Sequence, residues 1–346
     1  MTMSDDDDSL QTINEETERF DLPDEGFIAP GTNQRDLERF GVPPSPDPYT
    51  EPGLYRLWQD IIAQPLKPLP IEFVDTAGDS DYFQRAGPLR AAARHQSSRN
   101  WSGASIGAHD GRKFVSIAGT WRVPLVFALP PNDDYRSSTW IGLDGQRKYV
   151  DSTLPQIGTA QYVKRIGGVP TRTTESWVQW WPRKPVSIYQ MPVSPGDVVL
   201  AWMTVVNPLH VQFFILNLTA PPPFPFAPFK WRSPRVRWPG LPARVRARVS
   251  GATAEWVMER PTRLGSDELY KLPDYNQPVL ATRVPFPFTD CYASSMSVLG
   301  GPTREENLLT STLINMFKTH RTPYSAAKIS VAKRGDDHSF TTTYVP

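Results

Sequence analysis

The sequence predicts an all-β protein built from antiparallel strands, preceded by an N-terminal arm that is mostly irregular. From residue 100 onward, short β-type runs follow one another with turn signals between them. No strong helical pattern separates these runs, so parallel β-α-β units are not expected. Many short strands with intervening turns are typical of a sandwich or barrel. The length of 346 residues allows a sizeable core in such a domain.

The N-terminal part differs from the rest in charge and composition. Residues 1–30 contain ten acidic residues and a single arginine, a net charge of −9, which leaves +10 on the remainder of a chain whose formal charge is +1. Residues 1–50 are also rich in proline and are predicted to be a disordered arm, with at most one helical turn over 35–40. Residues 51–98 are predicted to form a linker with a helix over 53–63, which Pro65 ends.

The β-type runs can be placed along the predicted domain, residues 99–346. The clearest cover residues 114–123, 177–181, 198–206 and 211–218, and a turn at 194–197 precedes the third. Residues 221–242 contain too many prolines for a central strand. Residues 308–317 fit a helix by spacing, but 310–317 also fit a strand, and 328–333 and 339–345 are predicted to be closing strands.

Several kinds of site are disfavoured by the residues available. Cys291 is the only cysteine and the five histidines are scattered, so neither a metal centre, a cofactor nor a thiol nucleophile is expected. Residues 103–107 match the G-x-S-x-G nucleophile elbow, but a turn and a strand follow where that motif needs a helix. We interpret this stretch as a glycine-rich strand.

A basic run covers residues 230–248, with seven basic residues and no acidic one. Arg244, Arg246 and Arg248 alternate with small or apolar residues, which places them on one face of a strand. We interpret this stripe as a solvated face or as the docking site of the acidic arm, and we expect no nucleic-acid partner. If residues 1–98 are an inhibitory prosegment, acidification would loosen that docking.

Targeting signals are not recognisable in the sequence. The first residues are acidic where a signal peptide is basic and apolar, and no apolar run approaches the ~18 residues of a membrane span. The expectation is a monomeric cytoplasmic protein without a membrane partner, with leaderless export as the second interpretation.

Glu255 and Glu259 are two carboxyls on a predicted strand. Residues i and i+4 of a strand share a face but lie about 13 Å apart. The carboxyl pair of a glycosidase needs a shorter separation, of roughly 5 to 9.5 Å. Glu255 therefore requires a different partner.

Six sequence blocks, in order, resemble the glutamic peptidases, or eqolisins. They are residues 100–103 (NWSG), 138–145 (STWIGLDG), 154–158 (LPQIG), 177–182 (WVQWWP), 194–197 (SPGD) and 254–259 (AEWVME). The similarity covers residues 100–346, and the sequence after residue 259 is closer to bacterial relatives than to the fungal enzymes. It implies a lectin-like sandwich of two antiparallel sheets and an acid-active endopeptidase that cleaves polypeptides without a metal.

The resemblance also implies the site residues. Gln156 and Glu255 would form the catalytic dyad, and five residues would line or support the site: Trp101, Trp140, Asp144, Trp177 and Glu259. The chain departs from the fungal pattern at Ala160 and Gln179, where those enzymes carry acidic residues. Both departures change the charge near Glu255 and therefore its pKa and the optimum pH.

The chemistry of this dyad is physically reasonable. A glutamate carboxylate accepts a proton from water, and a primary amide donates an N–H to the oxyanion without changing its charge at low pH. An ordinary glutamate pKa near 4.3 suits a mildly acidic optimum. We expect both groups to face an open, water-filled hollow. The alternative is an inactive lectin-like or peptide-binding sandwich that uses Trp101, Trp140, Trp177, Trp180 and Trp181 as a stacking groove.

Overall fold

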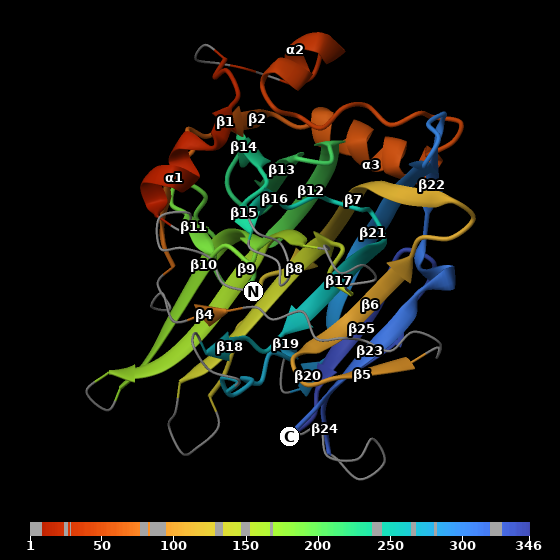
Figure 1. Cartoon of the computed structure of the whole chain (residues 1–346). Helices are drawn as coiled ribbons and strands as arrows, with labels where there is room; N and C mark the ends of the chain where they lie inside the picture. The colour runs from red at the N-terminus through yellow and green to blue at the C-terminus, as the bar shows by residue number, and fades with distance from the viewer. Residues whose placement is uncertain are drawn as a thin grey trace.

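Strands dominate the computed structural model, and the α-helices of the described part all lie before residue 63 (Figure 1). The structure describes residues 9–23, 27, 29–76, 82–83, 95–128, 134–146, 153–166, 169–236, 244–263, 268–279, 282–318 and 327–346. The α-helices in these ranges are α1 (Leu10–Glu15), α2 (Gln34–Arg39) and α3 (Pro52–Ile62). None of the helices in the described ranges is long and apolar enough to cross a membrane. The all-β prediction is confirmed.

Two antiparallel sheets face each other. The first has the order β14 (Phe224–Arg232), β13 (His210–Asn217), β12 (Val198–Asn207), β7 (Arg112–Arg122) and β21 (Phe286–Ser297), with β22 (Thr303–Glu306) beyond β21. The second has the order β11 (Val186–Ile188), β10 (Val169–Trp181), β9 (Leu154–Ile166), β8 (Tyr135–Leu143), β17 (Thr253–Glu259), β6 (Trp101–Gly107) and β23 (Thr312–Phe317).

Two strands close one side of the sandwich. β25 (Phe340–Tyr344) pairs with β21, and β24 (Lys328–Arg334) connects β25 to β23, so the two sheets form one hydrogen-bonded ladder. Shorter strands complete the fold: β5 (His95–Ser98) pairs with β23, β4 (Tyr82–Phe83) with β18 (Thr262–Arg263), β15 (Arg235–Val236) with β16 (Val245–Arg246), and β19 (Gln277–Val279) with β20 (Thr282–Val284).

The main core lies between the sheets. Ile141, Ile157 and Trp256 of the second sheet belong to the same buried cluster as Phe213 and Ile117 of the first. These side chains alternate along their strands with residues of the outer faces, as the period of two requires. The second sheet thus has one face in the core and an opposite face that carries a separate buried cluster of aromatic residues, including Trp101, Trp140 and Trp177.

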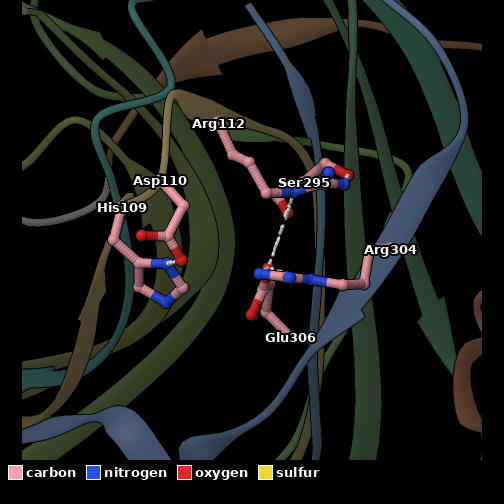
Figure 2. Close-up of polar contacts among 6 residues, drawn as sticks. All are labelled: His109, Asp110, Arg112, Ser295, Arg304 and Glu306. Carbon is pink, nitrogen blue, oxygen red and sulfur yellow. Dashed lines mark hydrogen bonds and ion pairs between the residues drawn. The ribbon is translucent and has the colours of Figure 1, made fainter.

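The turn between β6 and β7 shows how local sequence reverses the chain. Asp110 and Gly111 have φ of 54° and 66°, the left-handed region, and the N–H of Arg112 donates to the carbonyl of His109 at 3.0 Å, which closes a tight turn. β6 pairs within the second sheet and β7 within the first, so this turn carries the chain from one sheet to the other. Arg112, the first residue of β7, then donates to Ser295 on β21 (Figure 2). The Ser295 hydroxyl in turn donates to Glu306 on β22 at 2.7 Å. This polar cluster ties the ends of three strands together, far from the second sheet.

The prediction of a disordered arm is wrong for residues 9–23 and 29–50. β1 (Thr17–Arg19) pairs with β14, and α2 and α3 cover the outer face of the first sheet, at the top of Figure 1. There Leu37 and Val42 of the arm pack in one buried cluster with Trp58 of α3 and Trp202 of the sheet. The arm's few apolar residues suffice because each meets an apolar surface that the sheet already presents. Residues 1–8 and 24–26, with six of the arm's acidic residues, lie outside the described part.

Residues 51–98 also join the sandwich rather than forming a separate linker. The helix predicted over 53–63 is confirmed as α3. β2 (Leu66–Pro68) pairs in parallel with β14, and β3 (Phe73–Asp75) pairs with β11. Residues 77–81 and 84–94 are outside the described part, so the prosegment hypothesis stays a prediction.

The prediction against a central strand in the proline-rich stretch is wrong as well. β14 pairs with β13 on one side and with β1 and β2 on the other, although it contains Pro225 and Pro228. Pro228 lies between the residues that pair with β2, which end at Phe226, and those that pair with β1, which begin at Phe229. On that side of β14 no strand pairs with Pro228, so the missing N–H costs little there, while the other side of β14 pairs with β13.

The two remaining sequence ambiguities are decided by the structure. Residues 308–317 form a 3₁₀ turn at Leu308–Thr310 followed by β23, so the strand interpretation is correct for most of the segment. In the basic stripe only Val245–Arg246 is a strand. Arg246 nevertheless contacts the acidic arm, because its Nη2 lies 2.5 Å from Glu16 Oε1.

Glu16 is the arm's main polar anchor. Its second oxygen lies 2.5 Å from Nη2 of Arg183, whose side chain is 1% exposed. Arg183 follows β10, and the two arginines together lower the pKa of Glu16 against the opposing effect of burial. A guanidinium this deeply buried depends on its counter-ion, because desolvation of an unpaired charge is costly.

Replacing Glu16 with glutamine is therefore expected to destabilise the protein by about 3 kcal/mol, since it leaves Arg183 buried without a counter-charge. Urea unfolding at pH 7 measures the difference. Glu15→Gln is the matched control, because Glu15 is exposed and its recorded contact is with Gln11 of the same helix. Equal midpoints for the two variants would contradict the role assigned to the Glu16 ion pairs.

Candidate active site

Strand register brings Gln156 and Glu255 into one row. Glu255 on β17 is directly opposite Gly142 on β8, and Gly142 is directly opposite Gln156 on β9. Directly paired residues project from the same face of a sheet, and adjacent strands lie about 4.8 Å apart. The two backbones are thus about 10 Å apart, with no side chain on the residue between them. Two residues that are 99 positions apart in the sequence therefore lie in one row of the sheet.

The row continues on both sides with polar residues. Ser105 on β6 pairs with Glu255, and Gln179 on β10 pairs with Gln156. The resulting order across five strands is Ser105, Glu255, Gly142, Gln156, Gln179. All five lie on the face opposite the main core. This row is the polar centre of an otherwise aromatic surface.

The amide of Gln156 is oriented by hydrogen bonds. Its Nε2 donates to Oε1 of Gln179 at 2.7 Å, and Nε2 of Gln179 donates to the backbone carbonyl of Arg183 at 2.8 Å. The carbonyl can only accept, so it sets the direction of both amides. A primary amide has two N–H donors. Gln156 therefore keeps one N–H for another acceptor, and its Oε1 has no hydrogen-bond partner.

Glu255 is held in a desolvated position. It is fully buried, and its Oε2 accepts from the backbone N–H of Gly145 at 3.3 Å, while Oε1 has no partner. Burial raises the pKa of this carboxyl to about 8, the Thr253 hydroxyl opposes the rise, and the charge of Asp144 adds to it. The expectation of an ordinary pKa near 4.3 is wrong for this closed state, because the neighbours exclude water and supply few donors.

Asp144 organises the turn that covers Glu255. Its φ is 65°, and its carboxylate accepts from the backbone N–H groups of Ser250 and Ala252 at 2.6 and 2.7 Å and from the Ser250 hydroxyl at 2.8 Å. Burial nevertheless leaves the pKa of Asp144 above its usual value. These bonds tie the end of β8 to the segment before β17. Gly145 is thereby placed directly over Glu255.

The open hollow expected from the sequence is closed in the structure, since both Gln156 and Glu255 are 0% exposed. A Cβ on Gly145 would lie 2.7 Å from Cη2 of Trp101 and 3.3 Å from Cδ of Glu255. A Cβ on Gly142 would lie 2.8 Å from Cδ1 of Leu154. The turn at Gly145 and the Leu154 side chain thus fill the space above the row. A polypeptide reaches Glu255 only after they move.

The predicted supporting residues surround this row. Trp101 and Trp140 contact each other edge to face at 5.0 Å, and Trp177 belongs to the same cluster. Glu259 accepts from Nε1 of Trp140 at 2.7 Å and from Nδ2 of Asn100 at 3.2 Å. Burial raises the pKa of Glu259 to about 8 in spite of these bonds. At neutral pH its carboxyl is therefore largely protonated.

The stacking groove of the alternative interpretation is not present. Trp101, Trp140, Trp177 and Trp181 are all buried rather than open to a ligand. Trp180 lies on the opposite face, in the core between the sheets, with Nε1 donating to Thr153. Residues 177, 180 and 181 cannot share one surface because successive strand residues alternate between faces.

Some residues of the site were missed in the sequence. Ser105 was assigned to a glycine-rich strand, and β6 is such a strand, but its place beside Glu255 depends on the pairing of β6 with β17. Gln179 was noted only as a departure from the fungal pattern. Ala160, the other departure, packs in the aromatic cluster, which helps to keep this face dry. In the described residues no cluster of His, Cys, Asp and Glu could hold a metal ion.

Gln179 offers a test of the amide relay. Gln179→Leu is expected to lower kcat about 10-fold with little change in KM, because it leaves Gln156 unoriented. Gln179→Glu should be active mainly at acidic pH, where a protonated carboxyl both accepts from Gln156 and donates to Arg183. Steady-state kinetics across pH measure both effects, with Gln59→Leu on the exposed face of α3 as control. A pH profile of Gln179→Glu identical to that of the wild type would refute the relay.

The fold is that of the glutamic peptidases. Scytalido-glutamic peptidase, solved with a peptide-based transition-state analog, superposes with a TM-score of 0.52 at 17% identity over 72% of this chain and 99% of its own. SCP-B, an eqolisin solved with the tripeptide Ala-Ile-His, gives a TM-score of 0.50 at the same identity and coverage. Aspergilloglutamic peptidase from Aspergillus niger is 19% identical over 61% of this chain and 99% of its own, with a TM-score of 0.43. No curated protein matches the chain significantly.

Residues 99–333 match the Peptidase A4 family. The chain belongs to this family, and the resemblance inferred from the six sequence blocks is confirmed. It is a peptide hydrolase, a glutamic endopeptidase that acts on polypeptides.

Proposed function

We propose that this peptidase hydrolyses internal peptide bonds of unfolded polypeptides with Glu255 and Gln156 as its dyad. The observation that carries the proposal is the register of β17, β8 and β9, which aligns the two side chains across Gly142. A scissile carbonyl placed over Gly142 would have a carboxyl on one side and an amide donor on the other. Acyl transfer to water needs these two functions.

The reaction proceeds in two proton transfers. The Glu255 carboxylate takes a proton from water as the water oxygen attacks the carbonyl carbon. The free N–H of Gln156 donates to the oxyanion that forms. Glu255 then gives its proton to the leaving nitrogen as the carbon–nitrogen bond breaks, which releases an acid and an amine and restores the carboxylate.

Opening of the site is linked to the ionisation of Glu255. Burial is the largest cause of its raised pKa, so entry of water lowers that pKa from about 8 toward the ordinary 4.5. The closed form binds the proton more tightly, and rising pH therefore favours the open form. The apparent pKa that limits kcat/KM on the acid side of the pH profile is expected between 4.5 and 8. This is compatible with activity in mildly acidic solution.

The proposal is tested by incubating the full-length protein with an unfolded protein substrate from pH 3 to pH 9. Mass spectrometry of the products identifies the cleaved bonds, and Glu255→Gln runs in parallel. Internal cleavage by the wild type alone is the expected result. Binding of the substrate without any cleavage over the whole range would support the inactive-sandwich alternative instead.

A further inference from the structure

A basic cavity lies at one end of the sheet that carries the dyad. Its volume is about 420 Å³, and it is lined by five cationic side chains: Arg99, Arg260, Arg263, Lys271 and Lys318. Arg99 lies in the two-residue connection between β5 and β6, and Arg260 directly follows β17, so two of the five lie close to strands of the site. The cavity opens beyond Glu259, the last residue of β17.

The acidic residues of this cavity do not balance its positive charge. Asp134 also lines it, but its two oxygens accept from Nε and Nη2 of Arg136 at 3.0 and 2.7 Å, so that charge is already matched. Glu268 lies 4.0 Å from Arg263, and both side chains are well exposed. An exposed pair at this distance contributes little. Among the described residues that line the cavity, five cationic side chains therefore stand against two carboxylates, Asp134 and Glu268.

Two of the arginines that line the cavity have buried N–H groups without an acceptor. Nη2 of Arg260 donates to the backbone carbonyl of Arg99 at 2.8 Å, which holds the two residues together. The Nε atoms of both are buried without a hydrogen-bond partner. Burial and the neighbouring charge of Arg99 lower the pKa of Arg260 to about 10. A carboxylate would supply the missing acceptor and counter-charge, because guanidinium groups pair with it through several N–H donors.

The distance to the dyad fits one polypeptide occupying both places. Arg260 is five residues from Glu255 along a continuous stretch of chain, which at about 3.3 Å per residue is ~17 Å. An extended substrate advances by the same amount per residue. Its fifth residue from the scissile bond would then reach the cavity.

We propose that this cavity binds a carboxylate of the substrate about five residues from the scissile bond, so that the enzyme prefers acidic polypeptides; this rests on the proposed dyad. The carboxylate comes from an aspartate or glutamate side chain or from the substrate's C-terminus. Both sources offer the same chemistry to Arg99 and Arg260. Charge pairing of this kind weakens as salt rises.

The test is a set of fluorogenic peptides with one cleavable core and otherwise neutral residues. One glutamate is moved through the third to seventh positions on each side of the core, with free and amidated C-termini. We expect kcat/KM to rise about 10-fold at one position near the fifth, and less in high salt. If the rise in kcat/KM is kept in amidated peptides, the bound carboxylate is that of a side chain. If the rise is lost on amidation, the bound carboxylate is the C-terminus.

Variants locate the effect. The double variant Arg260→Gln/Arg263→Gln should remove the preference and leave the neutral peptide unaffected. Arg260→Lys should keep part of the preference. Arg232→Gln, at the exposed end of β14, should keep all of it. Equal kcat/KM for every glutamate position, or a preference that survives the double variant, would overturn the inference while leaving the dyad standing. If no peptide is cleaved, the proposed dyad fails. Binding of the same peptides to Glu255→Gln, measured by fluorescence anisotropy, then still tests the cavity. Equal affinity for acidic and neutral peptides would overturn the inference.

Discussion

Replacing Glu255 with glutamine is expected to reduce kcat by at least about 10³-fold while the protein stays folded. The amide keeps the size of the carboxyl and can accept from Gly145, but it cannot take a proton from water. The rate of cleavage of a fluorogenic peptide, measured at a known concentration of folded enzyme, gives the loss. Glu255→Ala should be equally inactive.

The same variant should change stability in a pH-dependent way. The folded-state pKa of Glu255 is about 8 against an ordinary 4.5, so between these values only the unfolded state ionises and the wild type loses stability as pH rises. Glutamine cannot ionise. Urea unfolding should therefore give equal free energies for wild type and Glu255→Gln at pH 4, and a more stable variant at pH 8, by on the order of 3–5 kcal/mol.

Glu259→Gln is the matched control for this pair of measurements. Glu259 lies on the same strand and face, is equally buried, and has its pKa raised to about 8 by the same cause. It should show the same gain of stability at pH 8. Because it is four residues from the row, it should lose less than about 10-fold in kcat. A similar loss of activity in both variants would show that burial of charge, and not the position of Glu255, determines the effect.

Removing the amide of Gln156 is expected to have the second largest effect. Gln156→Met preserves most of the volume but has no N–H, and the loss of one oxyanion donor typically lowers the rate by about 10²- to 10³-fold. The effect should fall on kcat with little change in KM, because the oxyanion exists only after attack. Gln156→Ala should show at least the same loss.

Gln161→Met separates this effect from a loss of packing. Gln161 lies on the same strand and is just as buried, but it points toward the opposite face, where its Nε2 donates to Thr159 at 2.9 Å. Its replacement should lower the free energy of unfolding and leave kcat of the folded enzyme near the wild-type value. If the two variants lose activity equally, Gln156 is a structural residue and the assigned role is wrong.

Local pattern was a good guide where a residue's role depends on its neighbours in sequence. The helix at α3, the turn at Asp110–Gly111 and the main strands follow from spacing, proline and glycine positions. The predictions of a disordered arm and of no central strand at β14 are wrong for a common reason. Their composition is poor for independent structure, but the arm and β14 pair with each other, and β14 also pairs with β2, although these strands are distant in the chain. Composition describes what a segment does alone, and pairing partners override it.

The same distinction between local sequence and tertiary structure applies to the candidate site. The six blocks by themselves indicated the family and the two-sheet fold, and they made Gln156 and Glu255 the candidates for the dyad, because those residue types lie in short contiguous motifs. Only the tertiary structure decided that the two lie in one row with Gln179, that the turn at Gly145 closes over them, and that Glu255 titrates near 8. Register, burial and pKa depend on atoms contributed by strands far apart in the chain, and no local window of sequence contains them.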